Sequence, residues 1–354
     1  MTLADLGWDA DFSRHFEPYG AQGLRPGRVA LEHQHIYRVY LEDGEPLAHV
    51  SGRLRHQATR RQDYPAVGDW VAVAPAADRR RTTIHAVLPR RSRFSRKAAG
   101  DVTEEQVVAA NVDTVFLVSG LDDEFSPRRI ERYLVTAREG GVSPVVVLNK
   151  ADLCGNVEAR VAEAGRVAPD VPVVVLSCRT GAGLGTLEPW VGPGRTVALL
   201  GSSGVGKSTL INRLLGRERQ RTREVRERDS RGRHTTSHRE LIVMPSGGLL
   251  IDTPGMRELQ LWEAGESLDG SFGDVVDLAA GCHFRDCRHE TEPRCAVRAA
   301  VEAGALPRER LASYLRLRRE LDHLARRQEE LAQAEQTRKD RVIHRRIRDL
   351  KPRE

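Results

Sequence analysis

The sequence predicts a multidomain α/β protein in which an OB-like β-barrel, a mostly parallel sheet flanked by helices, and a Cys/His-rich helical domain follow one another. Three observations predict it. Residues 28–98 alternate apolar and polar side chains in short runs, residues 99–265 alternate apolar runs with helical stretches, and residues 266–325 gather three cysteines among histidines. A weakly patterned segment that we expect to be flexible (1–27) precedes these domains, and a basic helix or tail (326–354) ends the chain.

Composition restricts the classes to which the protein can belong. Of its 354 residues 40% are hydrophobic, and no apolar run approaches the roughly 18–20 residues that cross a bilayer. The first residues show no cationic stretch followed by an apolar one, which a signal peptide would have. We therefore expect neither membrane insertion nor secretion.

The excess of positive over negative charge lies at the C-terminal end. From Pro307 onward the chain has 15 Lys or Arg and 9 Asp or Glu, and this excess of six equals the net charge of +6 of the whole chain. Such a tail indicates a polyanionic partner, either nucleic acid or an anionic membrane surface, or else a solvated charged helix. Only five basic residues are lysines: Lys97, Lys150, Lys207, Lys339 and Lys351.

The barrel is predicted from short strands that turns separate. We expect strands at 29–31, 35–41, 47–54, 67–73 and 83–88. About five short strands in about 70 residues are typical of a small closed barrel. Barrels of this kind bind oligonucleotides or dock on other proteins. The stretch Arg90–Lys97 places cations around Phe94, a weak indication of nucleic-acid binding.

The middle of the chain predicts a parallel sheet. We expect strands at 114–118, 144–148, 172–176, 196–200, 241–244 and 249–251, and helices at 127–139, 157–168 and 207–215. Continuous apolar strands that alternate with helices indicate a sheet buried on both faces. A long basic amphipathic helix is expected from about Pro307.

A phosphate-binding loop follows the strand at 196–200. The pattern G-x-x-x-x-G-K-[ST] is satisfied by Gly201, Ser202, Ser203, Gly204, Val205, Gly206, Lys207, Ser208 and Thr209. Its glycines let successive N–H groups face phosphate oxygens at a helix N-terminus. Lys207 would neutralise β- and γ-phosphate oxygens, and Ser208 would bind Mg²⁺. The pattern predicts a nucleoside triphosphate site, because a chance glycine turn would lack the flanking strand and helix.

A base-recognition element follows the strand at 144–148. It consists of Asn149, Lys150, Ala151 and Asp152, and it looks like the guanine-specific N-K-x-D of GTPases. The Asp152 carboxylate can accept hydrogen bonds from N1–H and the 2-amino group of guanine, whereas adenine would leave it unpaired, a discrimination on the order of 10⁴. The Lys150 stem would pack along the base plane. Ser177 and Cys178 begin a loop (177–181) that resembles the companion guanine loop, with cysteine where alanine is usual.

Two further segments resemble GTPase switches. Asp252 begins a D-x-x-G pattern after the strand at 249–251, and it would hold Mg²⁺ through a water while the Gly255 N–H senses the γ-phosphate. The Arg/Glu-rich run 217–233 resembles a switch I loop that a ligand orders. One of Thr235 and Thr236 should complete the Mg²⁺ shell.

The order of these motifs is rearranged. Most GTPases begin with the phosphate loop and place the guanine element near the end, whereas here 149–152 and 177–181 precede 201–209. Because ligand loops gather at the carboxyl ends of parallel strands however the strands are joined, a circularly permuted P-loop GTPase domain retains its site.

A metal site is predicted in the C-terminal domain. The spacing C-x₄-C-x-H-x₅-C is formed by Cys282, Cys287, His289 and Cys295. Three thiolates and one imidazole close a tetrahedral shell around one Zn²⁺ and leave no position for a reacting water, so the metal would be structural. His283 is the competing histidine, and free thiols are the alternative to a metal site. Cys154 and Cys178 are expected to be packing residues.

In combination, the barrel, the permuted motifs and the cysteine spacing resemble the ribosome small-subunit-dependent GTPase A family (RsgA or YjeQ) from about residue 28 to 320. The resemblance implies a cytoplasmic, monomeric GTPase that binds rRNA and ribosomal proteins of the small ribosomal subunit. It implies hydrolysis of GTP to GDP, stimulated by that subunit, late in its maturation.

The resemblance also implies roles for particular residues. His234 would orient the attacking water, Thr236 would bind Mg²⁺ and Lys207 would stabilise charge on the phosphates. Met256, directly after Gly255, cannot orient water by hydrogen bonding. The chain departs from the family pattern at Cys178 and in its basic tail.

Two alternatives remain at this level. The chain could be an RNA-binding module whose nucleotide is a static ligand, with Met256 marking lost catalysis. It could also be an ATP-dependent enzyme, which competition between GTP and ATP would test.

Overall fold

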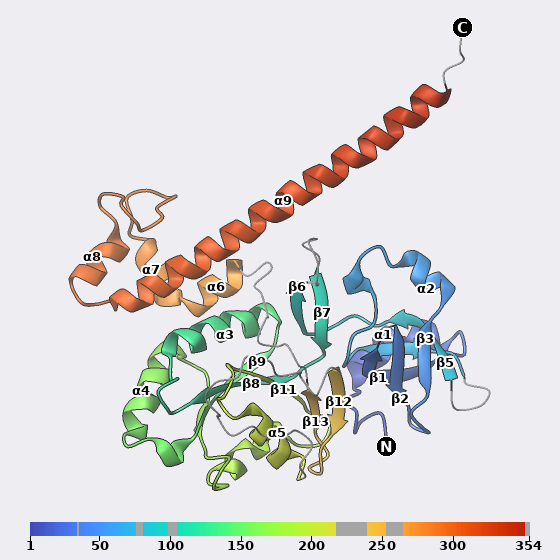
Figure 1. Cartoon of the computed structure of the whole chain (residues 1–354), viewed down its shortest axis with the longest axis horizontal. Coiled ribbons are helices and arrows are strands. Elements are labelled where there is room, and N and C mark those ends of the chain that lie inside the picture. Colours follow the sequence, from blue (N-terminus) through green and yellow to red (C-terminus); the bar gives the residue numbers. More distant parts are fainter. Residues whose placement is uncertain (34, 76–80, 98–104, 217–238, 253–264, 351–354) are drawn as a thin grey trace, which may run out of the picture. The chain divides into compact units, whose positions relative to one another are not determined.

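The computed structural model describes the chain except for residues 34, 76–80, 98–104, 217–238, 253–264 and 351–354. The chain divides into two compact units: the first takes in Met1–Lys97 and Glu105–Gln260, and the second Leu261–Glu354 (Figure 1). Within the described residues, no helix combines the length and the apolar composition needed to span a membrane.

The N-terminal part of the first unit is a closed five-stranded barrel, as predicted. Its strands are β1 (Arg25–His33), β2 (Ile36–Tyr40), β3 (Leu47–Val50), β4 (Trp70–Val73) and β5 (Arg81–Val87). Their order is β1-β2-β3-β5-β4, and β4 pairs back to β1 to close the barrel. Valine and isoleucine side chains fill its interior, among them Val29, Val71 and Ile84.

The rest of this unit is the predicted mostly parallel sheet. Its strands are β8 (Thr114–Gly120), β9 (Ser143–Asn149), β10 (Val173–Val175), β11 (Thr196–Leu200), β12 (Arg239–Val243) and β13 (Leu249–Asp252). They lie in the order β10-β9-β8-β11-β13-β12, and all pairs are parallel except the β12–β13 hairpin. The carboxyl ends of β8, β9, β10, β11 and β13 therefore meet at one edge.

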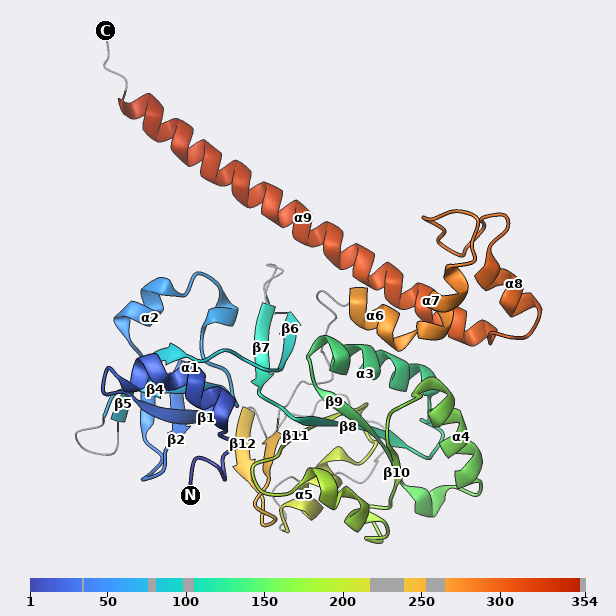
Figure 2. The same cartoon turned by 180° about the vertical axis from the view of Figure 1, so that it is seen from behind.

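Helices cover both faces of this sheet (Figures 1 and 2). The helices are α3 (Pro127–Glu139), α4 (Val157–Val167) and α5 (Lys207–Leu214), and short 3₁₀ turns occupy Arg61–Asp63, Ala151–Leu153 and Leu184–Trp190. Val115 and Leu117 of β8 pack in one core with α3 and α4, whereas the alternate residues Phe116 and Val118 pack in a second core with α5. This alternation is why the strands are apolar throughout.

The barrel and the parallel sheet are joined edge to edge. β12 pairs with β1 through Leu31↔Glu240 and Glu32↔Arg239, so that eleven strands form one sheet. The side chain of Arg28, which is 2% exposed, donates hydrogen bonds to the carbonyl oxygens of Gly68 and Asn111. The two parts therefore share a buried polar anchor as well as a strand pair.

The N-terminal segment differs from the expectation. Residues 1–27, predicted to be flexible, contain α1 (Ala10–Gly20), and β1 already begins at Arg25. Asp9 caps α1 by accepting hydrogen bonds from two backbone N–H groups. Phe12 is buried and the Trp8 ring packs edge-on against Trp70 at 4.7 Å. The prediction was wrong because the aromatic spacing of this segment was not recognised as helical.

Three further elements of the first unit, α2, β6 and β7, were not predicted. The strand expected at 47–54 ends at Val50, because Ser51 caps α2 (Gly52–Gln57) by accepting the Leu54 N–H at 3.1 Å. A two-stranded sheet of β6 (Arg93–Lys97) and β7 (Glu105–Ala110) follows the barrel.

The second unit is helical, as expected. It contains α6 (Gly265–Ser271), α7 (Gly273–Ala279), α8 (Ala296–Glu302) and α9 (Arg308–Leu350). The boundary expected at residues 325 and 326 falls inside α9, which is one continuous helix (Figure 2). Arg310 ties α9 to α7 through an ion pair with Asp274 at 3.0 Å, and its guanidinium lies over the Phe272 ring.

Candidate functional site

The phosphate loop lies between β11 and α5, where the sequence placed it. Gly206 has φ +96°, and a Cβ there would lie 2.2 Å from the Asn149 amide nitrogen, so only glycine fits. The Lys207 ammonium turns back along the loop and donates to the carbonyl oxygens of Gly201 at 2.6 Å and Ser202 at 2.5 Å. The loop thus presents a cation and helix N–H groups on one side, which suits phosphate oxygens.

Asn149 joins the guanine element to both other loops. Its amide nitrogen donates to the Val205 carbonyl oxygen of the phosphate loop at 2.8 Å. Its amide oxygen accepts the Cys178 backbone N–H at 2.9 Å. The side chain is 2% exposed. Three segments far apart in the sequence therefore meet at one buried amide, and the rearranged motif order assembles one site.

Asp152 faces the companion loop. Its carboxylate accepts a hydrogen bond from the Ser177 hydroxyl at 2.6 Å, and the same hydroxyl accepts the Thr180 N–H at 3.2 Å. Arg213 of α5 donates to the carbonyl oxygens of Cys178 and Arg179 at 2.9 Å each, which ties this loop to the helix of the phosphate loop.

Cys178 is a packing residue, as predicted. It is 2% exposed, and burial raises the pKa of its thiol to about 12. A protonated, buried thiol in place of alanine adds one atom to the core and brings no charge to the site.

Two residues of this site were missed by the sequence reasoning. Asp122, just beyond the end of β8, forms an ion pair with Lys150. The Tyr133 hydroxyl of α3 lies 3.2 Å from the Ser202 hydroxyl of the phosphate loop. For Asp122 the available signal was positional, because polar residues just beyond a parallel strand lie at the ligand edge. Nothing in the sequence marked Tyr133 of α3.

The switch residues are described only in part. Asp252 is the last residue of β13, and β13 lies beside β11 in parallel register, so Asp252 lies at the same sheet edge as the phosphate loop. The other residues assigned to the switches, which are His234, Thr235, Thr236, Gly255 and Met256, lie outside the described residues.

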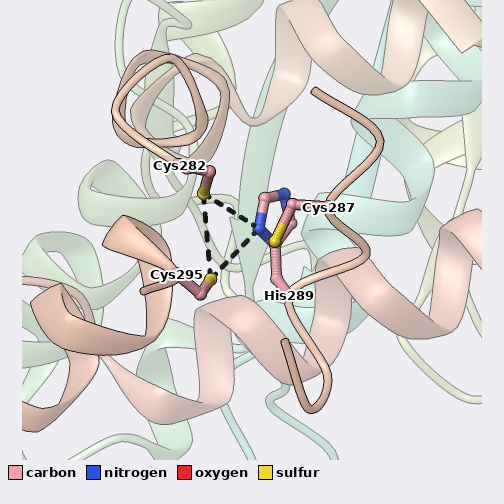
Figure 3. A group of neighbouring side chains, drawn as sticks. All are labelled: Cys282, Cys287, His289 and Cys295. Carbon is pink, nitrogen blue, oxygen red and sulfur yellow. Dashed lines mark hydrogen bonds between the residues drawn. The ribbon is translucent and has the colours of Figure 1, made fainter. Parts of the chain in front are cut away.

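The cysteine cluster of the second unit is compact (Figure 3). The ligand atoms of Cys282, Cys287, His289 and Cys295 all lie within 4.8 Å of one another. The sulfur atoms of Cys282 and Cys295 are 3.8 Å apart, and the Nδ1 atom of His289 lies 3.6 Å and 3.4 Å from them, respectively. These four residues form a group that could hold a metal ion.

The distances among Cys282, Cys295 and His289 match three edges of one tetrahedral shell. With Zn–S near 2.3 Å and Zn–N near 2.05 Å, the sulfur–sulfur edge of a tetrahedron is about 3.8 Å and the sulfur–nitrogen edge about 3.5 Å. Burial lowers the pKa of His289, which favours the neutral imidazole that a metal requires. His283, the competing histidine, is exposed and packs on Phe284 instead.

In the basic stretch after the barrel (90–97), two arginines and the aromatic ring make contacts within the first unit. Arg90 pairs with the buried Asp69 at 2.7 Å, and Arg91 pairs with Asp11 at 3.0 Å. Phe94 is 1% exposed and cannot stack on a base. Arg90, Arg91 and Phe94 therefore serve contacts within the first unit, and nucleic-acid binding by the rest of this stretch stays a prediction.

Comparisons with known proteins agree with this geometry. The family description "RsgA GTPase" matches residues 87–262. The small ribosomal subunit biogenesis GTPase RsgA of Opitutus terrae is 52% identical over 348 residues, covering 96% of this chain and 95% of that protein. The protein of the same name from Syntrophotalea carbinolica is 43% identical and covers 98% and 96%.

Solved structures show the same fold. YjeQ from Thermotoga maritima matches with a TM-score of 0.64 and 30% identity over 84% of this chain and 98% of that one. YloQ, described as a circularly permuted GTPase, matches with a TM-score of 0.61 and 25% identity over 85% and 96%. With its permuted loops joined at Asn149 and its near full-length relatives, this chain belongs to the RsgA GTPase family.

Proposed function

We propose that the chain hydrolyses GTP to GDP and phosphate at the edge of the parallel sheet, late in the maturation of the small ribosomal subunit, and that this subunit stimulates turnover. The observation that carries the proposal is the bridge made by Asn149 between the phosphate loop and the companion guanine loop. The relatives named small ribosomal subunit biogenesis GTPase support the cellular role.

Each loop has a role in the proposed reaction. The guanine edge is read by Asp152, whose position Ser177 supports. The phosphates lie along residues 201–209, where Lys207 neutralises charge that develops on the oxygens. His234 orients the attacking water, and the Gly255 N–H senses the γ-phosphate. Phosphoryl transfer depends mainly on positioning and electrostatics, so a slow intrinsic rate that the subunit raises is expected.

Magnesium fits the donors at this edge. Ser208 is the second residue of α5 and Asp252 ends β13, so a hydroxyl and a carboxylate lie on loops of adjacent parallel strands. Oxygen donors of this kind are the ligands that Mg²⁺ prefers. We propose that Ser208, Asp252 and Thr236 hold Mg²⁺ with the nucleotide, where it neutralises charge shared by the β- and γ-phosphates.

Zinc is the metal proposed for the second unit. Three thiolates and the imidazole of His289 supply four ligands within 4.8 Å of one another, which would close a tetrahedral shell and make the site structural. The cluster is braced by α9, since the Tyr314 ring lies 6.4 Å from that of His289 and Arg319 pairs with Glu290 at 2.8 Å.

A groove in the second unit supports a contact with rRNA. It has a volume of about 420 Å³ and is lined by Arg288, Glu290, Leu315, Arg318, Arg319, Asp322, His323 and Arg326. Four arginines face two carboxylates, so the groove has an excess of positive charge that suits phosphate groups. We propose that this groove contacts the rRNA of the subunit.

The test is GTP turnover by the full chain, with and without purified small subunits. We expect strong stimulation, competition by GDP and none by ATP. Replacing Arg288 and Arg326 by glutamine should weaken stimulation and leave intrinsic turnover unchanged, whereas Arg128→Gln, at an exposed position of α3, should leave both unchanged. Turnover that the subunit does not alter would contradict the proposed role, and nucleotide binding without turnover would favour a static ligand.

The proposed partner also sets the location. Because the proposed partner is the small ribosomal subunit, we propose that the chain works in the cytoplasm, as a monomer without a membrane partner. Light scattering on the purified chain should give the mass of one chain, 39.4 kDa.

A further inference from the structure

The lysine of the guanine element makes its charged contact outside the three loops that bind the nucleotide. Lys150, the first residue after β9, adopts a left-handed conformation with φ +65°. Its ammonium donates to the Asp122 carboxylate. Asp122 lies two residues beyond the end of β8, the strand that neighbours β9.

Asp122 is itself held in place. The Leu121 N–H donates to the Asn149 carbonyl oxygen at 2.8 Å, which fastens the segment after β8 to the start of the guanine element. The Glu124 N–H donates to the second carboxylate oxygen of Asp122 at 3.3 Å. Burial raises the pKa of Asp122, but the hydrogen bond and charge of Lys150 outweigh burial and lower it below its usual value. The group is therefore a carboxylate at neutral pH.

We propose that Asp122 is a positioning residue for guanine recognition. Asp122 holds the Lys150 ammonium in one position. The aliphatic part of the Lys150 side chain is thereby ordered to pack along the plane of the bound base. A long side chain ordered in advance loses less conformational entropy when the ligand binds. This inference rests on the proposed function, because it concerns the same nucleotide site.

The exposure of the Lys150–Asp122 pair indicates that it positions the Lys150 side chain more than it stabilises the fold. The side chains of Lys150 and Asp122 are 23% and 25% exposed, and partly exposed ion pairs contribute little to folding. The position also carries one of only five lysines among 56 basic residues. A lysine offers a four-carbon stem with one compact charge at its end, whereas the planar guanidinium of arginine would present a second flat surface to the base.

A double-mutant cycle on the full chain tests the coupling. We expect Asp122→Asn to weaken binding of a fluorescent GDP analogue by about three- to ten-fold. In a Lys150→Ala background the same change should alter the dissociation constant less than about two-fold, because the partner is absent. Asp122→Glu should restore part of the affinity. Asp123→Ala, at the exposed neighbouring position, is the matched control and should bind like the wild type.

Equal losses in both backgrounds would overturn the proposal, since Asp122 would then act without Lys150. A lowered unfolding midpoint of Asp122→Asn with unchanged affinity would assign the pair to folding alone and would also overturn it.

A comparison of ligands distinguishes contacts with the plane of the base from contacts with its hydrogen-bonding edge. Hypoxanthine lacks the 2-amino group that Asp152 reads, but it offers the same plane to Lys150. Asp122→Asn should therefore weaken binding of GDP and of inosine diphosphate by the same factor and leave the dissociation constant of tripolyphosphate unchanged. A larger loss for GDP would show that Asp122 acts through the edge, against the proposal. A wild-type chain that did not prefer guanine nucleotides to ADP would instead contradict the proposed function.

Discussion

At the scale of single residues, the cysteine cluster supports the choice that the sequence spacing made between two histidines. His289 lies within 3.6 Å of two cysteine sulfurs, whereas His283 is exposed, although both stand near Cys282 and Cys287 in the sequence. The spacing C-x₄-C-x-H-x₅-C favoured His289, and the fold supplies the reason. His289 adopts a left-handed conformation, with φ +61°, and its Nδ1 atom faces the sulfur atoms of Cys282 and Cys295.

This difference gives a prediction for metal binding. His289→Ala should remove one of four ligands and reduce bound zinc in the purified chain to less than about a tenth, with loss of helical signal from the second unit. The measurement is metal content by mass spectrometry together with circular dichroism. His283→Ala is the matched control and should retain one zinc per chain. Equal metal content in the two variants would contradict the assignment of the ligand.

Sequence reasoning found the phosphate loop, the guanine element and the cysteines because each is a local pattern with its own chemistry. It missed Asp122 and Arg28, whose roles depend on partners distant in the sequence. Arg28 reaches the carbonyl oxygens of Gly68 and Asn111, and nothing near Arg28 in the sequence marks it as buried.

At the scale of elements, the barrel contains two arginine–aspartate pairs that differ in burial. Asp69 is 0% exposed and accepts hydrogen bonds from Arg90 at 2.7 and 2.8 Å. Asp43 accepts from Arg25 at 2.9 and 3.0 Å, but both side chains are about two-fifths exposed. Both pairs are bidentate, and they differ most in exposure, so burial should decide their contributions to stability.

We therefore predict unequal losses of stability. Asp69→Asn should lower the free energy of unfolding by about 3–5 kcal/mol, because it leaves the Arg90 charge without its partner in a dry site. Asp43→Asn should lower it by less than about 1 kcal/mol. Urea unfolding of both variants measures the difference. Similar losses for the two would show that burial does not govern these pairs.

Helix α1 depends on an aspartate with a second role. Asp9 caps the helix and also binds Arg91 at 2.6 Å, and the hydrogen bonds from Arg91 lower the pKa of Asp9 to about 2. A carboxylate with a depressed pKa contributes stability above its ordinary pKa near 3.8, and this contribution is lost as the pH falls from about 4 to 2. Because half of the side chain is exposed, the contribution is below about 1 kcal/mol.

The pH dependence can be separated from the cap. Asp9→Asn keeps an acceptor for the helix but does not titrate, so it should be less stable than the wild type at pH 7 and approach it by about pH 2. Asp9→Ala should lose about 1 kcal/mol more than Asp9→Asn at every pH, because it also removes the cap. Urea unfolding at several pH values would contradict this if the gap between wild type and Asp9→Asn widened in acid.

The same helix shows why some elements escaped prediction. Trp8, Phe12, Phe16 and Tyr19 recur at helical spacing, but the glycines around them made the segment look weakly patterned. The parallel strands were predicted well because each is buried on both faces and so is apolar throughout, a signal that does not depend on which strand lies next to it.

At the scale of the whole molecule, the expected barrel and GTPase domains form one unit. The β1–β12 pair makes eleven strands one sheet, and one hydrophobic core takes in Trp70 of the barrel together with Leu117 and Ile251 of the parallel sheet. Sequence reasoning divided them at residue 98 because the pattern changes there. It had no way to detect the pairing of two strands about 200 residues apart.

Cooperative unfolding should follow these units and not the sequence domains. Because the barrel and the parallel sheet share a sheet and a core, calorimetry of the full chain should show one transition for both, which GDP raises in temperature by binding the folded state. The second unit should melt separately, at a temperature that a zinc chelator lowers and GDP does not change. Trp8 and Trp70 report on the barrel side of the first unit, so in a chain with Trp190 and Trp262 replaced by phenylalanine, fluorescence should follow the transition that GDP shifts. If the barrel unfolds at the same temperature with and without GDP, the pairing of β1 with β12 does not couple the unfolding of the barrel to that of the parallel sheet.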